Sequence, residues 1–238
     1  MLARLSFVVF LLFFSAVLVA FWPSYFSRLA AQPTYHPHAH GIAMTLWCLM
    51  LIAQALLIRS GHRSLHRTIG RASYVLVPVI VLVTLNFLHF RVSGVRVFDD
   101  VVLYFMALIV NALVAFAAIY GLAIYHRRNA QLHARFMLAT IFPLFTPVTD
   151  RLIGAYWPGL AASVPQIGGT PVLPFAGFVL ADSLLLLLVL WDWRANRRFD
   201  AFAAALGITF VYHVSVMSFH ELPAWEDFAA WFVRLPLS

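Results

Sequence analysis

The stretch HPHAHGIAMTLWCLMLIAQALLIRSGHRSLHRTIGR, from His36 to Arg71, decides the fold of this chain. Its middle, from Gly41 to Ile58, is an apolar run close to the length of about 20 residues that a helix needs to cross hydrocarbon. Histidines stand at both ends of the run, and arginines accompany them at one end only. The stretch therefore predicts a membrane-spanning helix with imidazoles gathered at both faces of the bilayer.

The composition of the whole chain points the same way. Of its 238 residues, 63% are hydrophobic and 11% are charged, and the mean hydropathy is +0.89. Such values exclude a soluble domain. The formal charge of +7 comes from arginine alone, because the chain contains no lysine. The arginines cluster in short stretches between apolar runs, which favours interaction with the lipid bilayer and excludes nucleic acid as a partner.

The sequence predicts an all-α fold, a polytopic membrane helical bundle with about seven transmembrane helices in a single integral membrane domain covering residues 1–238. No linker is long enough to divide the chain, and no repeat is evident. The first run is longer than the core of a signal peptide, so we expect a retained anchor. The predicted spans lie near residues 5–26, 40–58, 69–90, 98–125, 134–157, 171–193 and 200–219.

A short amphipathic helix is predicted after the last span, over residues 224–235. Trp225, Phe228 and Phe232 fall on one side of this helix, opposite Glu226 and Asp227. Such a distribution is typical of a helix that lies in the membrane interface.

The arginines also predict the orientation of the chain. Three connections between predicted spans carry most of them, at positions 59–71, 127–135 and 194–198. These connections must share one side of the membrane, and the positive-inside rule assigns that side to the cytoplasm. We therefore expect a multi-pass protein of the bacterial inner membrane with a cytoplasmic N-terminus and a periplasmic C-terminus.

Several polar residues fall inside the predicted spans. Asp182 lies near the middle of an apolar run and is the most costly acid in the chain, hence a functional candidate, or else it is neutral or bonded to Asn111. Pro143 and Pro147 should kink the fifth span and open a polar cavity outward. The adjacent Asp150 and Arg151 point about 100° apart on a helix, so we expect them to pair with other helices.

The second span carries a polar stripe at helical spacing. His40, Met44, Trp47, Leu51 and Gln54 recur every three or four residues and should face protein, because unsatisfied polar groups in hydrocarbon cost several kcal/mol. At the outer end of the third span, Asn86 and His89 share a face, and Asn86 could fix the tautomer of His89. Two interpretations of the stripe remain open: it packs against neighbouring helices, or it also holds a ligand.

Two groups of short motifs support a resemblance. His40, Trp47, Gln54, His66-Arg67 and Gly70, together with the run HARFML from His133 to Leu138, resemble a family of uncharacterised bacterial inner-membrane proteins. The layered histidines are loosely similar to the haem-binding helical cores of the cytochrome b561 kind. The likeness covers about half of the chain, and the fourth span lacks the deep histidine of such cores.

The first functional hypothesis is a haem b protein that transfers electrons within the membrane, to or from a quinone or another membrane redox protein. A haem needs axial imidazoles, and its propionates need arginine. His66 with Arg67 and Arg71, facing His133 with Arg135, would supply both at the cytoplasmic side.

The second hypothesis is a transition-metal site at the outer face, holding zinc or copper for binding or metal-dependent membrane chemistry. His36, His38 and His40 alternate along one segment and so expose their imidazoles. A carboxylate could complete the coordination sphere of the metal. The candidate ligands are His36, His38, His40, His89, His213, His220, Glu221 and Asp150. The third hypothesis is a non-catalytic transporter or assembly factor that uses the kinked fifth span and Asp182.

Overall fold

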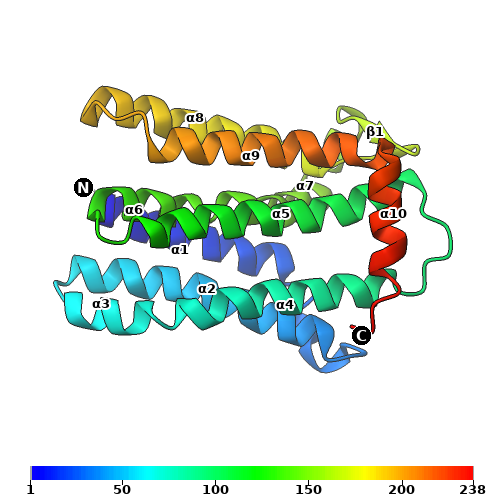
Figure 1. The fold of residues 1–238 in the computed structure, drawn as a ribbon, viewed down its shortest axis with the longest axis horizontal. Coiled ribbons are helices and arrows are strands. Elements are labelled where there is room, and N and C mark those ends of the chain that lie inside the picture. Colours follow the sequence, from blue (N-terminus) through cyan, green and yellow to red (C-terminus); the bar gives the residue numbers. More distant parts are fainter. Residues whose placement is uncertain (1, 238) are drawn as a thin grey trace. The chain divides into compact units, whose positions relative to one another are not determined.

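The structure is a computed structural model that describes residues 2–237, with side chains from Leu5 onward, and it is almost entirely helical (Figure 1). Six helices are long and apolar enough to cross a membrane, and a seventh, bent pair passes the same test when taken together. The all-α, multi-pass fold is thereby confirmed. By their contacts the helices fall into two compact units, Met1–Ser93 with Pro236–Ser238, and Gly94–Leu235. Whether they form one membrane domain stays a prediction.

The first unit is built around the helix predicted from the opening stretch. This helix, α2 (His36–Arg59), packs against α1 (Leu2–Phe21) on one side and α4 (Ser73–Val92) on the other. A 3-10 turn, η1 (Phe26–Ala31), joins α1 to α2, and the short α3 (Arg63–Gly70) precedes α4. The polar stripe of α2 does face protein, since Trp47, Leu51 and Gln54 are all buried.

The second unit contains four long helical segments, one of them bent. They are α5 (Asp100–Tyr125), the pair α6 (Ala130–Ala139) and α7 (Thr146–Tyr156), α8 (Pro174–Asn196), and α9 (Ala201–Ser218). Two 3-10 turns, η3 (Pro158–Ala162) and η4 (Phe219–Glu221), and a small hairpin of β1 (Gln166–Ile167) and β2 (Thr170–Pro171) complete the connections. In the hairpin Gln166 pairs with Pro171 and Ile167 with Thr170.

The break between α6 and α7 confirms the predicted kink. A 3-10 turn, η2 (Phe142–Leu144), separates the two helices, which bend by 44°. Pro143 lies in that turn and Pro147 begins α7, where the missing N–H of proline is tolerated. The fifth span is therefore two helices rather than the single helix predicted over 134–157.

Contacts at the two ends of this unit show in which direction its helices run. Arg198, between α8 and α9, donates to Gln131 at the start of α6 with a distance of 3.0 Å. At the other end, the hairpin glycine Gly168 lies against Val101 at the start of α5. The α6–α7 pair thus begins at the arginine-rich end of the unit and leads to the hairpin end.

The last helix, α10 (Pro223–Phe232), crosses the hairpin end of the same unit at a steep angle to α5 and α9 (Figure 1). The Trp225 indole N–H donates to the Leu103 carbonyl at 3.0 Å, which ties α10 to the first turn of α5. Trp225, Ala229 and Phe232 form the buried side of α10, while Glu226 and Asp227 are exposed. The helix has the predicted amphipathic pattern.

Close packing of α7 on α8 depends on a single glycine. A Cβ added at Gly177 would collide with the hydroxyl of Thr149 and contact the backbone of Thr146. The absence of a side chain at this position brings the polar residues of α7 next to α8, where Asp182 lies.

Candidate functional site

The polar centre of the second unit is a pair formed by Asp182 of α8 and His213 of α9. The His213 Nδ1 lies 2.9 Å from an Asp182 carboxylate oxygen. The His213 side chain is 5% exposed and that of Asp182 is 24% exposed. The alternative in which Asp182 bonds to Asn111 is wrong, because the Asn111 amide donates to the Ser215 hydroxyl at 2.8 Å. The carboxylate is thus paired with an imidazole inside the apolar part of the bundle.

Aromatic rings hold the imidazole of His213 in place. Phe178 of α8 stacks on it with ring centroids 4.2 Å apart, and Tyr212 lies beside it at 4.7 Å. Phe178 also contacts the Tyr212 ring edge-on. The packing leaves the ring few orientations, so the hydrogen bond of Nδ1 to Asp182 fixes which nitrogen faces away from α8.

Seven buried polar atoms of this unit have no hydrogen-bond partner among the described residues, and five of them lie on helices α5, α7, α8 and α9. Buried polar groups are nearly always satisfied by protein or water, so such a group of atoms in one bundle marks a place for bound water or ligand. These five are the second nitrogen of His213, the second carboxylate oxygen of Asp182, and the hydroxyls of Tyr104, Thr146 and Tyr212; the other two belong to Arg198 and His220.

Asp150 of α7 interacts with two of these hydroxyl-bearing residues. Electrostatic interactions link it to both Tyr104 and Tyr212. Its carboxylate also lies 3.3 Å from the guanidinium of Arg151. The prediction that these neighbours pair only with other helices is therefore wrong: the long Arg151 side chain bends back, and the same guanidinium nitrogen donates to the Pro147 carbonyl at 2.7 Å.

At the arginine-rich end, a buried ion pair joins α6 to α8. The Arg135 guanidinium makes two parallel hydrogen bonds to Asp192, at 2.7 and 2.6 Å, and the side chains are 5% and 2% exposed. Asn196 donates to the same carboxylate at 2.7 Å, and Arg135 also donates to the Gln131 carbonyl. A two-pronged contact with this many supporting hydrogen bonds is the geometry in which a buried pair is best satisfied.

A second, more exposed pair extends this network toward the connection of α8 and α9. Arg198 binds Asp200, the residue that caps α9. Burial opposes the charged form of Asp200, but the hydrogen bonds from Arg198 and from the Ala201 N–H outweigh it and lower the pKa of the carboxyl. The buried charged groups at this end of the unit therefore have more hydrogen-bond partners than Asp182 and His213 have.

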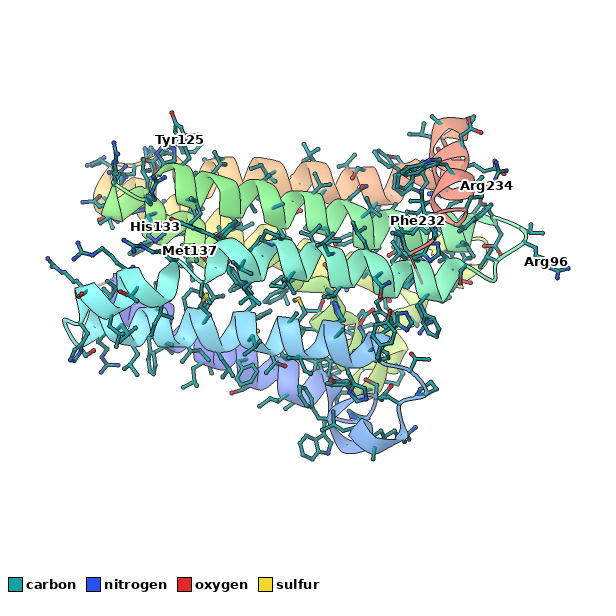
Figure 2. The ribbon with its side chains drawn as sticks, turned by 60° about the horizontal axis from the view of Figure 1, so that its bottom comes forward. Arg96, Tyr125, His133, Met137, Phe232 and Arg234 are labelled. Carbon is teal, nitrogen blue, oxygen red and sulfur yellow. The ribbon has the colours of Figure 1, made fainter. Side chains whose placement is uncertain are left out.

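A hydrogen bond defines the ring orientation of His133, a predicted haem ligand. Its Nδ1 lies 2.8 Å from the Ala123 carbonyl, which can only accept, so Nδ1 carries the proton in the neutral ring. Metal-binding histidines in proteins are commonly oriented by such a bond to a carbonyl. His133 lies at the end of the unit where Tyr125 is found (Figure 2). Its orientation fits a role as an axial ligand.

His66 has the opposite proton arrangement. The Gly70 N–H and the His66 carbonyl fix the orientation of the Gln54 amide, whose nitrogen then donates to Nδ1 of His66. The proton of a neutral His66 ring therefore sits on the other nitrogen, and no lone pair is left for an iron. This arrangement does not fit an axial ligand. His66 and His133 belong to different units, and their pairing stays a prediction.

The arginines of the predicted haem site also differ in whether they are available to a propionate. Arg135 is occupied by Asp192 and buried, so it does not suit a propionate. Arg67 and Arg71 are exposed. Of the predicted haem residues, His133 fits the group, whereas His66 and Arg135 do not in the arrangement that the structure has.

The outer histidines of the first unit each have a different neighbour. His36 bonds to Thr34 at 3.2 Å and stacks on Phe90. His38 contacts the Tyr25 hydroxyl, and His40 lies 3.0 Å from the Thr84 hydroxyl. His89 is buried in α4, while the Asn86 amide interacts with Tyr35 and with the Leu237 carbonyl. His36, His38 and His40 therefore have different partners, although they alternate along one short segment.

No group of three or more histidine, cysteine, aspartate or glutamate side chains that could hold a metal ion occurs among residues 2–237. His220 lies 3.9 Å from Glu221, whose side chain is 76% exposed. The predicted outer ligands are therefore not gathered into a group of three among the described residues, and a zinc or copper site there stays a prediction.

Sequence reasoning missed Asp192 and the hydroxyls of Tyr104, Thr146 and Tyr212. A signal for Asp192 did exist, since an acid among the arginines that end a span is well placed for an ion pair. Nothing in the spacing marks the two tyrosines, because aromatic residues are common in spans. Only their burial together makes them notable.

Comparison of the chain with models of known protein families, with curated proteins and with solved structures gave no match. The site is therefore interpreted from its own geometry.

Proposed function

We propose that this chain is a proton-coupled membrane transporter, in which Asp182 and His213 bind and release the coupling proton. The observation that carries the proposal is the part-buried 2.9 Å contact between these residues, with an unpartnered polar atom on each side chain. Ionisable residues inside a membrane bundle are costly, and they commonly serve proton relays and substrate pathways.

The chemistry at the pair is a proton transfer. With Nδ1–H donating to the carboxylate, the second nitrogen of His213 holds the lone pair that accepts a proton. The resulting imidazolium is neutralised by Asp182, so uptake of one proton removes the net negative charge of the pair. Such a change of charge in an apolar bundle is strong enough to favour one helix arrangement over another.

The break between α6 and α7 supports movement near this site. Unpaired backbone groups at such a break are tolerated inside a membrane where they are covered by protein, and transporters commonly place broken helices beside their sites. In this chain α7 carries Asp150 and Thr146, and Gly177 brings α7 against α8. A change in the bend would alter the surroundings of the Asp182–His213 pair directly.

We further propose seven crossings, with the N-terminus in the cytoplasm of a bacterial cell and α10 on the outer surface of its inner membrane. Support comes from the passes of α5 to α9, which alternate between the two ends of their unit. Figure 2 places Tyr125 and His133 at one end and Arg96, Phe232 and Arg234 at the other. The two arginine-rich connections of this unit, near residues 127–135 and 194–198, lie at the first of these ends, and Trp225 with Phe232 would anchor α10 in the opposite interface.

Reporter fusions test this topology. Fusions after Arg63, Arg128 and Arg197 should report cytoplasm, and fusions after Arg96, Gly168 and Leu235 should report the periplasm, because arginine-rich connections are retained inside. If α6 and α7 formed a re-entrant loop, the fusions after Gly168 and Arg197 would exchange sides. That exchange would reduce the count to six and contradict the proposed orientation of α10.

A pH-jump experiment tests the proton-binding function. Purified protein is reconstituted in vesicles on a solid support, and acid is applied to the outer side. We expect a transient charge displacement as the pair takes up protons, and its loss in Asp182→Asn, because the amide keeps a hydrogen-bond acceptor but not the charge. Asp227→Asn, a change on the exposed side of α10, should respond like the wild type. A wild-type response that Asp182→Asn retains would refute the proposal.

A haem b protein is the second candidate, and the orientation of His133 is the observation that favours it. A bound haem would supply one-electron chemistry, and His133 would provide an axial imidazole. Protein made with haem precursor should then show an α-band in the reduced-minus-oxidised visible spectrum. His133→Ala should abolish the band, while the nearby His126→Ala should preserve it. The absence of a band in the wild type would eliminate this candidate.

A further inference from the structure

Three hydroxyl groups lie together in the interior of the α5–α9 unit. They belong to Tyr104 of α5, Thr146 of α7 and Tyr212 of α9, whose residues are 8%, 0% and 3% exposed. None of these hydroxyls has a hydrogen-bond partner among the described residues. Leaving one buried hydroxyl unsatisfied costs about 1–3 kcal/mol, so three in one place call for a shared partner.

Interactions across helices bring these hydroxyls and one carboxylate into a single group. Tyr104 interacts electrostatically with Tyr212 and Asp150. Tyr212 lies close enough to Thr146 and Asp150 to interact with both, although no direct hydrogen bond with good geometry is formed. Water bridging these hydroxyls would satisfy the donors and acceptors that have no partner among the described residues.

The hydroxyl group adjoins the proton-binding pair on one side and Asp150 on the other. Tyr212 is the sequence neighbour of His213, and Phe178 packs against both of their rings. Asp150 is partly exposed, with its side chain at 27%. The hydroxyls therefore have a partly exposed carboxylate and a buried imidazole among their neighbours.

We propose that Tyr104, Thr146 and Tyr212 bind water that connects Asp150 to His213 and so forms the route by which protons reach the pair. The inference rests on the proposed function and adds to it the path and the entry residue. Ile167, Val172 and Val216 pack in one core cluster with Tyr104 and Tyr212, and such apolar side chains offer no hydrogen bond to water.

Transfer along this route needs no other reactant. A hydroxyl or water accepts a proton from the Asp150 side on its lone pair and donates its own O–H proton to the next acceptor. The last donor passes its proton to the unpartnered nitrogen of His213, and each hydroxyl regains one proton. Phenol and alcohol groups suit this role because each is both a donor and an acceptor.

The experiment removes the hydroxyls while leaving the pair intact. The variants are Tyr104→Phe, Thr146→Val, Tyr212→Phe and their triple combination, reconstituted for the same pH jump. We expect the triple variant to retain the amplitude of the charge displacement, because Asp182 and His213 remain, but to slow its rise at least tenfold. Tyr120→Phe is the matched control, since that buried tyrosine of α5 lies about 24 Å further along the helix axis at about 1.5 Å per residue.

A second measurement detects the water itself and does not depend on proton binding. Infrared difference spectra are recorded after exchange into ¹⁸O water, which shifts the O–H stretching bands of ordered water. We expect shifted bands in the wild type and in Tyr120→Phe, and their loss in the triple variant. Bands unchanged by the triple substitution, or a wild-type rate of charge displacement in that variant, would overturn the route. Absence of any charge displacement in the wild type, with the water bands present, would instead refute the transporter proposal alone.

Discussion

Asp192→Ala is expected to be the most destabilising single substitution at a charged position of the α5–α9 unit. It would leave the Arg135 guanidinium buried and without its carboxylate, and removal of one partner from a buried ion pair costs about 3–5 kcal/mol. The loss would separate α6 from α8 and also remove the acceptor of Asn196. Unfolding of the purified protein in mixed micelles, followed by tryptophan fluorescence, measures the effect.

The matched variants separate the cost of an unpaired charge from the cost of lost packing. Arg135→Ala should destabilise by a similar amount, because it leaves Asp192 alone. Arg135→Met combined with Asp192→Leu should recover most of the stability, since an apolar pair of similar volume has no charge to desolvate. Asp200→Ala, at the exposed pair, should cost about 0.5–2 kcal/mol, mainly through the lost helix cap. An Asp192→Ala protein as stable as Asp200→Ala would show that the buried pair does not hold α6 to α8.

His213→Leu is expected to abolish the charge displacement that follows a pH jump. The substitution removes the atom that accepts the proton and leaves Asp182 without its partner. Stability should fall by about 1–3 kcal/mol, the range for a buried polar group that loses its hydrogen bond, because Asp182 retains partial exposure. Both quantities are measured on the same preparation, by vesicle electrophysiology and by unfolding in micelles.

The double variant distinguishes a functional pair from a structural one. Asp182→Leu combined with His213→Leu should regain stability, as at Arg135 and Asp192, but it should not regain any proton response. His220→Leu is the control, because that histidine lies on the following turn outside the pair. Recovery of the response in the double variant, or its persistence in His213→Leu, would assign proton binding to another group.

The membrane class and the approximate positions of the helices could be predicted from the sequence. Length and apolarity suffice for these features, because any segment of about 20 apolar residues must satisfy its own backbone in hydrocarbon by forming a helix. The kink was also predictable, since Pro143 and Pro147 act through local sterics and a missing N–H. The buried stripe of α2 followed from the period of a helix, and burial of Trp47 and Gln54 confirms it.

The pairings of the polar residues could not be predicted in the same way. Asp182 was recognised as costly, yet its partner proved to be His213 rather than Asn111, because the register between α8 and α9 places the imidazole opposite the carboxylate. Likewise Arg135 was expected to be available for a propionate, whereas Asp192, 57 positions later, occupies it. A partner on another helix leaves no periodic signal in a single sequence.

What the sequence by itself determined is therefore a helical membrane protein with a kinked segment, charges concentrated at one set of connections and one acid deep in an apolar run. These properties depend on the local chemistry of the chain against lipid and water. The tertiary structure alone decided that this acid faces His213, that Arg135 is paired with Asp192, and that hydroxyls of α5, α7 and α9 are buried and interact with one another. Those outcomes depend on how helices are rotated and shifted against each other, which is set by close packing at positions such as Gly177.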